Sequence, residues 1–376
     1  VVDAFASLST VDLKVQDDLT VTDDASVGGN LTLTGNGDFN GDLDVDGTTE
    51  TDALSINGSA LKYKAFGTSS IMFGDDATGT ISSADNNTGL GVDVFAALTE
   101  GDDNTAVGTN ALKAATTGHS NTVIGKAAGE AITTGNENVF VGERSGDACT
   151  EGTNNTGVGH KALSDLTTGV SNDAFGNDAG LSITTGTRNV AIGSFTLDAT
   201  TTGGQNTAVG YAALTANTTA SGNTAVGDSA MEANTTGTAN VAMGEDALKS
   251  NTTGSTNTAI GTESLESNTT GSGNTAIGHD SSLSITTGGE NTSLGINSVR
   301  TLTTGSFNTG LGGGALQAAT TSANNTAVGY NSMNANTTGG SNVAIGANAL
   351  DANTTGDDLT AVGKDAMGGN TTGISN

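Results

Sequence analysis

The sequence predicts an all-β repeat fold: a β-solenoid, or β-roll, of 17-residue coils that is expected to assemble as a homotrimer. A glycine recurs every 17 residues from Gly74 to Gly363, in 18 copies, without one insertion or deletion. The residues around it recur as well, and the coil from Asn206 to Gly222 reads N-T-A-V-G-Y-A-A-L-T-A-N-T-T-A-S-G. A fixed period of this kind is typical of stacked repeats, in which each unit packs only on its neighbours.

Composition limits the classes of function that the chain can have. The 376 residues carry a net charge of -29, with 57 glycines and neither proline nor tryptophan. High charge alone would favour disorder, but the strict register favours a fold built from regular turns. The acidic excess disfavours binding to nucleic acid. No apolar run approaches the roughly 20 residues that span a bilayer, so we expect no membrane insertion.

The chain divides into three expected segments. Residues 1–60 form an acidic β-repeat stalk, because apolar and polar residues alternate in blocks spaced 12 residues apart, at Leu19, Leu31 and Leu43. Residues 61–69 break both periods and are interpreted as a junction. Residues 70–376 form the 17-residue-repeat solenoid, which is expected to continue in a longer polypeptide.

Each position of the coil has a predicted role. The residue before the glycine, such as Val209, is apolar in all 18 copies and is expected to form the buried spine of the core. The glycines, Gly210 and Gly227 among them, are expected to permit a positive φ or a close backbone approach. Asparagines four residues earlier, such as Asn206 and Asn223, predict a ladder of stacked amides. The Thr-Ala-Val run between them predicts one strand per coil.

The remainder of the coil is predicted less completely. Residues 212–216, with the apolar Leu214, fit either a helical turn or a second extended run, and Asn251 to Gly254 fits a turn whose glycine is left-handed. In three copies the residue equivalent to Leu214 is glycine, and an apolar residue appears three positions later. We interpret this residue as a displaced apolar plug, which makes Cys149 a packing residue and not a reactive thiol. The three pairs are Gly129 with Ile132, Gly146 with Cys149, and Gly180 with Ile183.

The thinness of one coil favours association of several chains. A 17-residue coil buries few apolar side chains, while ordering its backbone costs on the order of 1 to 2 kcal/mol per residue. Coils must therefore stack, and three chains packed side by side would bury a second face. The small residues at Ala208 and Ala213 are expected to permit that close approach. At about 4.8 Å per coil, 18 coils would extend for about 85 Å.

Two sets of motifs resemble known fibrous proteins. The N-V-A-I-G stretches at Asn189–Gly193 and Asn342–Gly346 resemble the head repeats of trimeric autotransporter adhesins, which are left-handed parallel β-roll trimers. The segments D-L-T-V-T, G-G-N-L-T-L-T and G-D-L-D-V-D-G look like stalk repeats of phage tail fibres, especially marine ones. These resemblances imply an extracellular structural and adhesive shaft of a phage tail or virion fibre used in host attachment, with further copies of the chain and other fibre or virion proteins as partners. A bacterial trimeric surface adhesin or extracellular filament is the alternative.

No catalytic or cofactor site is expected, so the chain is not predicted to be an enzyme. His119, His160 and His279 fall on different coils. Acidic pairs could bind Ca²⁺, with solvated charge as the alternative; they are Asp17-Asp18, Asp23-Asp24, Asp75-Asp76 and Asp102-Asp103.

The position after the glycine is the most variable one, which predicts exposure. Tyr211, Tyr330, His160 and His279 occupy it and are the candidate surface contacts if the side of the shaft binds a glycan or receptor, and a neutral exposed surface is the favoured alternative. Ice binding is a rival function, because threonines recur in pairs such as Thr252-Thr253. Adjacent threonines of a strand point to opposite faces, which disfavours a flat face with two threonine rows.

Overall fold

The computed structural model describes residues 54–56, 59–61, 63–66, 70–74 and 83–375. Among these residues there are 21 strands and no helix. Strands β1 (Leu54–Ile56) and β2 (Ser59–Leu61) pair antiparallel with each other. The 12-residue blocks of the expected stalk lie outside the described residues, as do Asp17-Asp18, Asp23-Asp24 and Asp75-Asp76.

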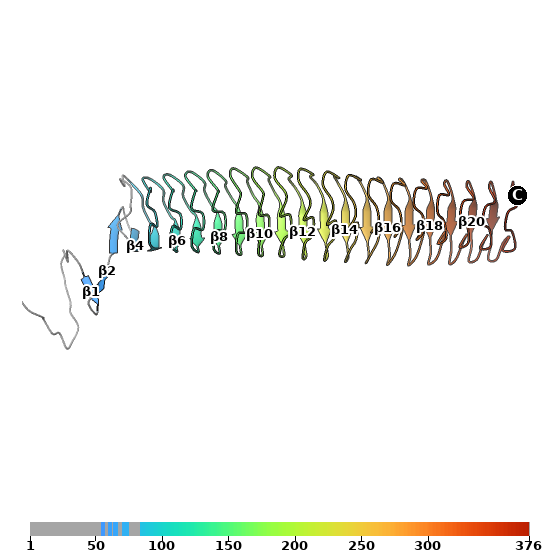
Figure 1. The fold of residues 1–376 in the computed structure, drawn as a ribbon, viewed down its shortest axis with the longest axis horizontal. Helices are drawn as coiled ribbons and strands as arrows, with labels where there is room; N and C mark the ends of the chain where they lie inside the picture. The colour runs from blue at the N-terminus through green and yellow to red at the C-terminus, as the bar shows by residue number, and fades with distance from the viewer. Residues whose placement is uncertain (1–53, 57–58, 62, 67–69, 75–82, 376) are drawn as a thin grey trace, which may run out of the picture. The chain divides into compact units, whose positions relative to one another are not determined.

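The solenoid is a single ladder of short strands (Figure 1). Strand β3 (Tyr63–Phe66) pairs antiparallel with β4 (Ser70–Gly74), and from β4 onward each strand pairs in parallel with the strand one coil later. Ala208 lies opposite Ala225, 17 residues on. Among the described residues, β3 and β21 are the two edges of the ladder and do not pair with each other. The predicted solenoid of 17-residue coils is therefore confirmed, with 18 parallel strands.

The strands that follow β4 succeed one another at the repeat spacing. They are β5 (Thr88–Gly91), β6 (Thr105–Val107), β7 (Thr122–Ile124), β8 (Val139–Val141), β9 (Thr156–Val158), β10 (Asp173–Phe175), β11 (Val190–Ile192), β12 (Thr207–Val209), β13 (Thr224–Val226), β14 (Val241–Met243), β15 (Thr258–Ile260), β16 (Thr275–Ile277), β17 (Thr292–Leu294), β18 (Thr309–Leu311), β19 (Thr326–Val328), β20 (Val343–Ile345) and β21 (Thr360–Val362).

The apolar residue before each glycine does not form the core, and this prediction was wrong. Within a strand only the central residue is buried: Ala208 is 0% exposed, whereas Thr207 and Val209 beside it are half-buried. Side chains alternate between the faces of a strand, so Thr207 and Val209 share the outer face. The spine of the core is thus the row of residues equivalent to Ala208, opposite the row equivalent to Leu214, which is also 0% exposed.

The small residues of the repeat pack inside the thin coil. Ala208 and Ala213 are both fully buried within the coil, so they cannot mediate the approach of neighbouring chains as expected. A larger residue at the strand position requires space elsewhere. Phe140 takes that position in one coil, and a Cβ atom on Gly146 of the same coil would lie 2.5 Å from the Phe140 ring. Phe140 therefore fills the volume that a leucine occupies in other coils.

The predicted plug residues do pack inside the solenoid. Ile132, Cys149 and Ile183 are buried at 1% exposure or less. A Cβ atom on Gly129 would lie 3.0 Å from Ile132 Cδ1, and one on Gly180 would lie 3.0 Å from Ile183 Cδ1. The glycine and the later apolar residue thus share one space, which explains why they change together.

The predicted asparagine ladder is confirmed. All 16 of its asparagines are buried, and each bonds to its equivalent one coil away. In Asn206 the backbone N–H and Nδ2 both donate to Asn189 Oδ1 at 3.1 Å, and Nδ2 also donates to the Ala220 carbonyl at 2.9 Å. Asn206 Oδ1 in turn accepts the N–H of Asn223 at 3.0 Å. Leu359 takes the next place after Asn342 and ends the ladder, although its N–H still donates to Asn342 Oδ1 at 2.9 Å.

The glycine after each strand is required by both backbone conformation and space. Gly210 has φ of 134°, and a Cβ atom there would lie 2.3 Å from the carbonyl oxygen of Gly227. Gly227 has φ of 143° and the same close approach to Gly244. Both predicted reasons for this glycine are confirmed.

The segment after this glycine is neither a helical turn nor an extended run. It is an irregular bend in which the second and fourth residues, Ala212 and Leu214, have φ of 52° and 54°. The later turn also differs from expectation, because Gly254 is not left-handed. Instead, a Cβ atom on Gly254 would lie 2.3 Å from the Gly271 carbonyl oxygen, so close stacking of the coils requires this glycine. Asn251 does stabilise the turn, since Nδ2 donates to the Gly254 carbonyl at 3.0 Å.

Candidate interaction surfaces

The most extensive candidate surface is the apolar row on the outer face of the sheet, which we call the outer row. It contributes one apolar side chain per coil. Nine of the 18 members are at least 37% exposed, from Phe73 at 37% to Val362 at 68%, and the others are half-buried. The members are Phe73, Leu90, Val107, Ile124, Val141, Val158, Phe175, Ile192, Val209, Val226, Met243, Ile260, Ile277, Leu294, Leu311, Val328, Ile345 and Val362.

The outer row is long enough to be an interface. Eighteen coils at about 4.8 Å extend for about 85 Å, and a three-residue strand is about 10 Å long. The outer face of the sheet therefore covers roughly 850 Å², which compares with about 800 Å² per partner in a standard protein interface. A continuous row of partly exposed apolar side chains along a face of this size indicates an interaction site.

Threonines form two further regular rows. The first residue of many strands, as in Thr207, lies on the outer face beside the outer row. The turn supplies another row, in which the two neighbouring threonines differ. Thr252 is part-buried and its Oγ1 donates to the Thr269 carbonyl at 3.0 Å, whereas Thr253 is exposed. The turn thus presents one exposed threonine row and not two, as the sequence indicated.

The predicted contact residues are exposed but are not brought together. Tyr211 and Tyr330 are 56% and 64% exposed, and the side chains of His160 and His279 are 48% and 56% exposed. All four lie at the bend after the strand. The two tyrosines are 119 residues apart, which is seven coils, or about 34 Å along the solenoid.

These four residues differ in their neighbours. Tyr211 packs edge-on against Phe195 of the preceding coil, with ring centroids 5.8 Å apart. His160 Nδ1 lies 3.1 Å from Asn177 Oδ1 and 3.9 Å from Asp178 Oδ1, while His279 Nδ1 lies 2.9 Å from Asp280 Oδ1. The histidines therefore lie beside acidic residues, whereas Tyr211 packs on an aromatic ring.

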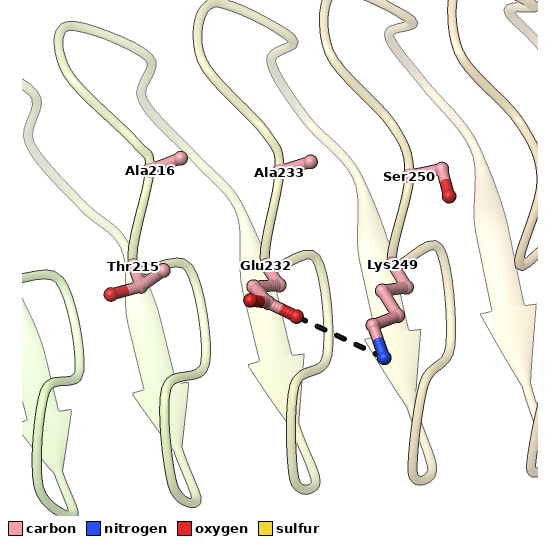
Figure 2. A pocket seen from close by; sticks show the side chains of 6 residues that line it. All are labelled: Thr215, Ala216, Glu232, Ala233, Lys249 and Ser250. Carbon is pink, nitrogen blue, oxygen red and sulfur yellow. Dashed lines mark ion pairs between the residues drawn. The ribbon is translucent and has the colours of Figure 1, made fainter.

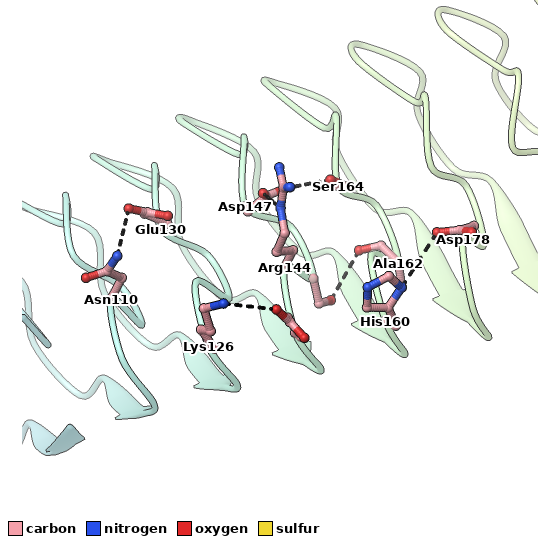
Figure 3. A network of polar contacts seen from close by, with 11 residues as sticks. Asn110, Lys126, Glu130, Arg144, Asp147, His160, Ala162, Ser164 and Asp178 are labelled. Atoms are coloured by element: carbon pink, nitrogen blue, oxygen red, sulfur yellow. Dashed lines mark hydrogen bonds and ion pairs between the residues drawn. The ribbon is translucent and has the colours of Figure 1, made fainter. Parts of the chain in front are cut away.

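Polar side chains on the bend side link successive coils (Figure 3). Lys126 Nζ lies 3.3 Å from Glu143 Oε1, one coil later. Asp147 accepts from Arg144 Nε at 2.7 Å and from Ser164 Oγ at 2.6 Å. Asp147 raises the pKa of Arg144 through this hydrogen bond and its charge. The Lys126–Glu143 pair is exposed and contributes little stability, whereas the Asp147 side chain is only 12% exposed.

A shallow groove crosses three coils in the middle of the solenoid (Figure 2). It is lined by Thr215, Ala216, Glu232, Ala233, Lys249 and Ser250. Lys249 Nζ lies 3.0 Å from Asp246 Oδ1 and 4.0 Å from Glu232 Oε2. The hydrogen bond to Asp246 is the main reason why the pKa of Lys249 is raised, so this amine stays protonated at neutral pH. A charged, paired lysine is not a nucleophile.

The structure shows how the remaining candidates for chemistry are placed. Cys149 is 0% exposed, and burial raises the pKa of its thiol to about 12, which agrees with the predicted packing role. The residues that the structure describes contain no group of three or more His, Cys, Asp or Glu side chains placed to hold a metal ion. Of the last acidic pair, Asp102 Oδ1 accepts the N–H of Asp85 at 2.7 Å. No helix suited to crossing a membrane occurs in this part of the chain.

Two comparisons with known proteins give no relatives. No family model matches the chain, and no curated protein is significantly similar to it.

Proposed function

We propose that the chain is a passive structural and adhesive fibre shaft, extracellular, in which copies associate through the outer row. The observation that carries this proposal is the outer row itself: 18 apolar side chains on one face of an uninterrupted ladder. Water contact with this row is unfavourable, at about 25 cal/mol per Å² of apolar surface. Covering it stabilises a coil that is too thin to bury many apolar groups inside.

A second copy of the chain is the partner that this row fits best. The row repeats once per coil, at about 4.8 Å, over about 85 Å. Only a surface with the same period can match it in register over its full length, and another copy has that period by construction. Symmetric self-association is also the commonest form of protein assembly. The resemblance to trimeric adhesin heads supports three copies, while the row supplies the surface.

The same resemblances support the biological setting. A tail or virion fibre of a phage, used in host attachment, fits the combination of 17-residue and 12-residue repeats. A bacterial trimeric surface adhesin or extracellular filament would use the same shaft. In both settings the shaft performs no reaction and needs no cofactor, and its partners are its own copies, other fibre proteins and a host surface.

The test measures the mass of the chain in solution by sedimentation equilibrium. We expect a mass of three chains for the native sequence. The double variant Val209→Asp/Val226→Asp places two charges in the outer row and should dissociate the assembly. The control Thr219→Asp/Thr236→Asp places the same charges on the exposed threonine row of the same two coils and should leave the mass unchanged. A folded, monomeric native chain would overturn the proposal.

Ice binding is a second candidate, and one observation favours it. The outer face carries a threonine row beside the outer row, with threonine in five successive strands from β15 to β19. Such a face presents hydroxyl and methyl groups at one coil spacing. Self-association would cover this face, so the two functions exclude each other there. Thermal hysteresis in a solution of the monomeric variant and not of the assembled chain would favour ice binding.

A further inference from the structure

We infer that the bend around Gly313 and Tyr330 is a binding site for an uncharged carbohydrate. The inference deepens the proposed attachment role and rests on it, because it names the chemical class of the surface ligand. It begins with the distribution of charge. No Asp, Glu, Lys, Arg or His occurs from Thr301 to Leu350, a run of 50 residues in a chain with a net charge of -29.

Charged residues border this window at both ends, and Asp351 follows it directly, one coil after Asn334. Arg300 lies just before it, and its Nε is 3.1 Å from Asp280 Oδ2. Asp280 is itself 7% exposed. The nearest cation on the preceding coils is therefore paired, and the window presents an uncharged surface about three coils long. The window offers no cationic group to bind an anion, and the acidic residues elsewhere in the chain attract a cation more strongly.

Within the window, two glycines interrupt the bend. Gly313 occupies the variable exposed position, between Ile296 one coil before and Tyr330 one coil after, which are 58% and 64% exposed. A Cβ atom on Gly313 would lie 3.5 Å from Ile296 Cγ2 and 3.7 Å from Tyr330 Cδ2. Both distances are ordinary van der Waals contacts. The notch between the two side chains therefore accommodates one layer of ligand atoms.

Amide side chains gather beside this notch. A Cβ atom on Gly314 would lie 2.4 Å from Asn331 Oδ1, so the Asn331 amide occupies the space that Gly314 leaves. Asn334 Nδ2 donates to the Gly314 carbonyl at 3.1 Å and to Gln317 Oε1 at 3.0 Å. These two bonds hold Asn334 and Gln317 in place. Asn334 Oδ1, Gln317 Nε2 and the Asn331 amide remain to bond a ligand.

This combination matches the chemistry of a sugar ring. One face of a pyranose presents C–H groups that pack on an aromatic ring such as Tyr330, and its hydroxyl groups both donate and accept hydrogen bonds. Amides also offer donors and acceptors without charge. Tyr211 occupies the equivalent bend seven coils earlier, but its ring packs on Phe195, and the acidic Asp228 takes the same position one coil later. It is therefore a matched control.

The experiment measures binding of the native chain to maltose, cellobiose, lactose and chitobiose, beside sialyl-lactose and a sulfated disaccharide, by saturation-transfer NMR and calorimetry. We expect at least one neutral sugar to bind, with little dependence on salt, and the acidic sugars not to bind. Tyr330→Ala should weaken binding at least tenfold. Gly313→Val should do the same by filling the notch, and it is compatible with the fold because Ile296 occupies the same position one coil earlier. Tyr211→Ala should bind as the native chain does.

Three results would overturn this inference: no neutral sugar binds, the acidic sugars bind more tightly, or Tyr211→Ala loses binding as much as Tyr330→Ala. Circular dichroism melts of each variant separate loss of the site from loss of the fold. Sedimentation of the same samples gives the assembly state. A trimer that binds no sugar would contradict the carbohydrate site alone, whereas a monomer that binds sugar would contradict the fibre proposal and leave the site standing.

Discussion

Removal of one ladder asparagine should destabilise the solenoid by several kcal/mol. Asn172 is 0% exposed; its Nδ2 donates to the Gly186 carbonyl at 2.8 Å, and its Oδ1 accepts the N–H of Asn189 at 3.1 Å. In Asn172→Ala the carbonyl and the N–H both lose these bonds in the interior. Each buried unsatisfied group costs about 1 to 3 kcal/mol, so we expect a loss of about 2 to 6 kcal/mol.

A leucine at the same position separates lost hydrogen bonds from lost volume. Leu359 occupies this ladder position natively and is 0% exposed, so a leucine side chain fits there. Asn172→Leu should therefore refill the cavity and still show most of the loss in unfolding free energy that is expected for Asn172→Ala. Thr253→Ala, on the exposed turn, should change stability by less than about 0.5 kcal/mol. Denaturant unfolding gives the free energies, and hydrogen exchange at the Asn189 amide locates the loss. An Asn172→Leu variant as stable as the native chain would refute this reasoning.

Three further predictions concern backbone, packing and burial. Gly210→Ala should destabilise the chain by at least about 3 kcal/mol in thermal or denaturant melts, because φ is 134° and the added Cβ meets the next coil. Gly222→Asn should be nearly neutral, because φ is 73° and the space is open. Equal effects of the two substitutions would contradict the steric explanation. Phe140→Ala should lower the free energy of unfolding by about 3 to 5 kcal/mol. Gly146→Leu should destabilise on its own but recover part of this loss when it is combined with Phe140→Ala. A double-mutant cycle without coupling would contradict the shared volume. Burial raises the pKa of Cys149 to about 12, so its thiol should resist iodoacetamide from pH 7 to 9 and react only on unfolding. Rapid labelling of the folded chain would contradict this burial.

The period and the polar ladders could be predicted from the sequence because they depend only on position. A strict 17-residue spacing places each residue next to its equivalent, so the stacking of Asn206 on Asn189 follows directly. The close approach at Gly210 follows too, since stacked turns leave no room for a Cβ atom. Exposure of Tyr211 and Tyr330 was predictable because their position tolerates every kind of side chain.

The inner and outer faces could not be predicted in the same way. The apolar character of Val209 predicted that it is buried, and the small size of Ala208 predicted that it lies at an interface between chains. The structure reverses both, because Ala208 is buried inside the coil and Val209 lies on the outer face. The physical reason is the thinness of the coil: the strand and the bend are so close that only alanine fits opposite Leu214, and the larger residue is left on the outer face. A sequence signal that could have revealed this is Phe140, which stands where other coils have alanine, while Gly146 of the same coil stands where they have leucine. This coil pairs a large inner residue with a missing side chain.

The accessibility of the outer row in the assembled chain tests the fibre proposal most directly. A Cys149→Ala chain that carries Val226→Cys in the outer row is compared with one that carries Thr253→Cys on the exposed turn, using a thiol-reactive dye. If copies associate through the outer row, the cysteine at position 226 reacts at least tenfold more slowly than the one at 253. It reacts fast once two charges in the outer row, Ile192→Asp/Val209→Asp, dissociate the assembly. Equal, rapid labelling at both positions in the assembled chain would contradict association through this face.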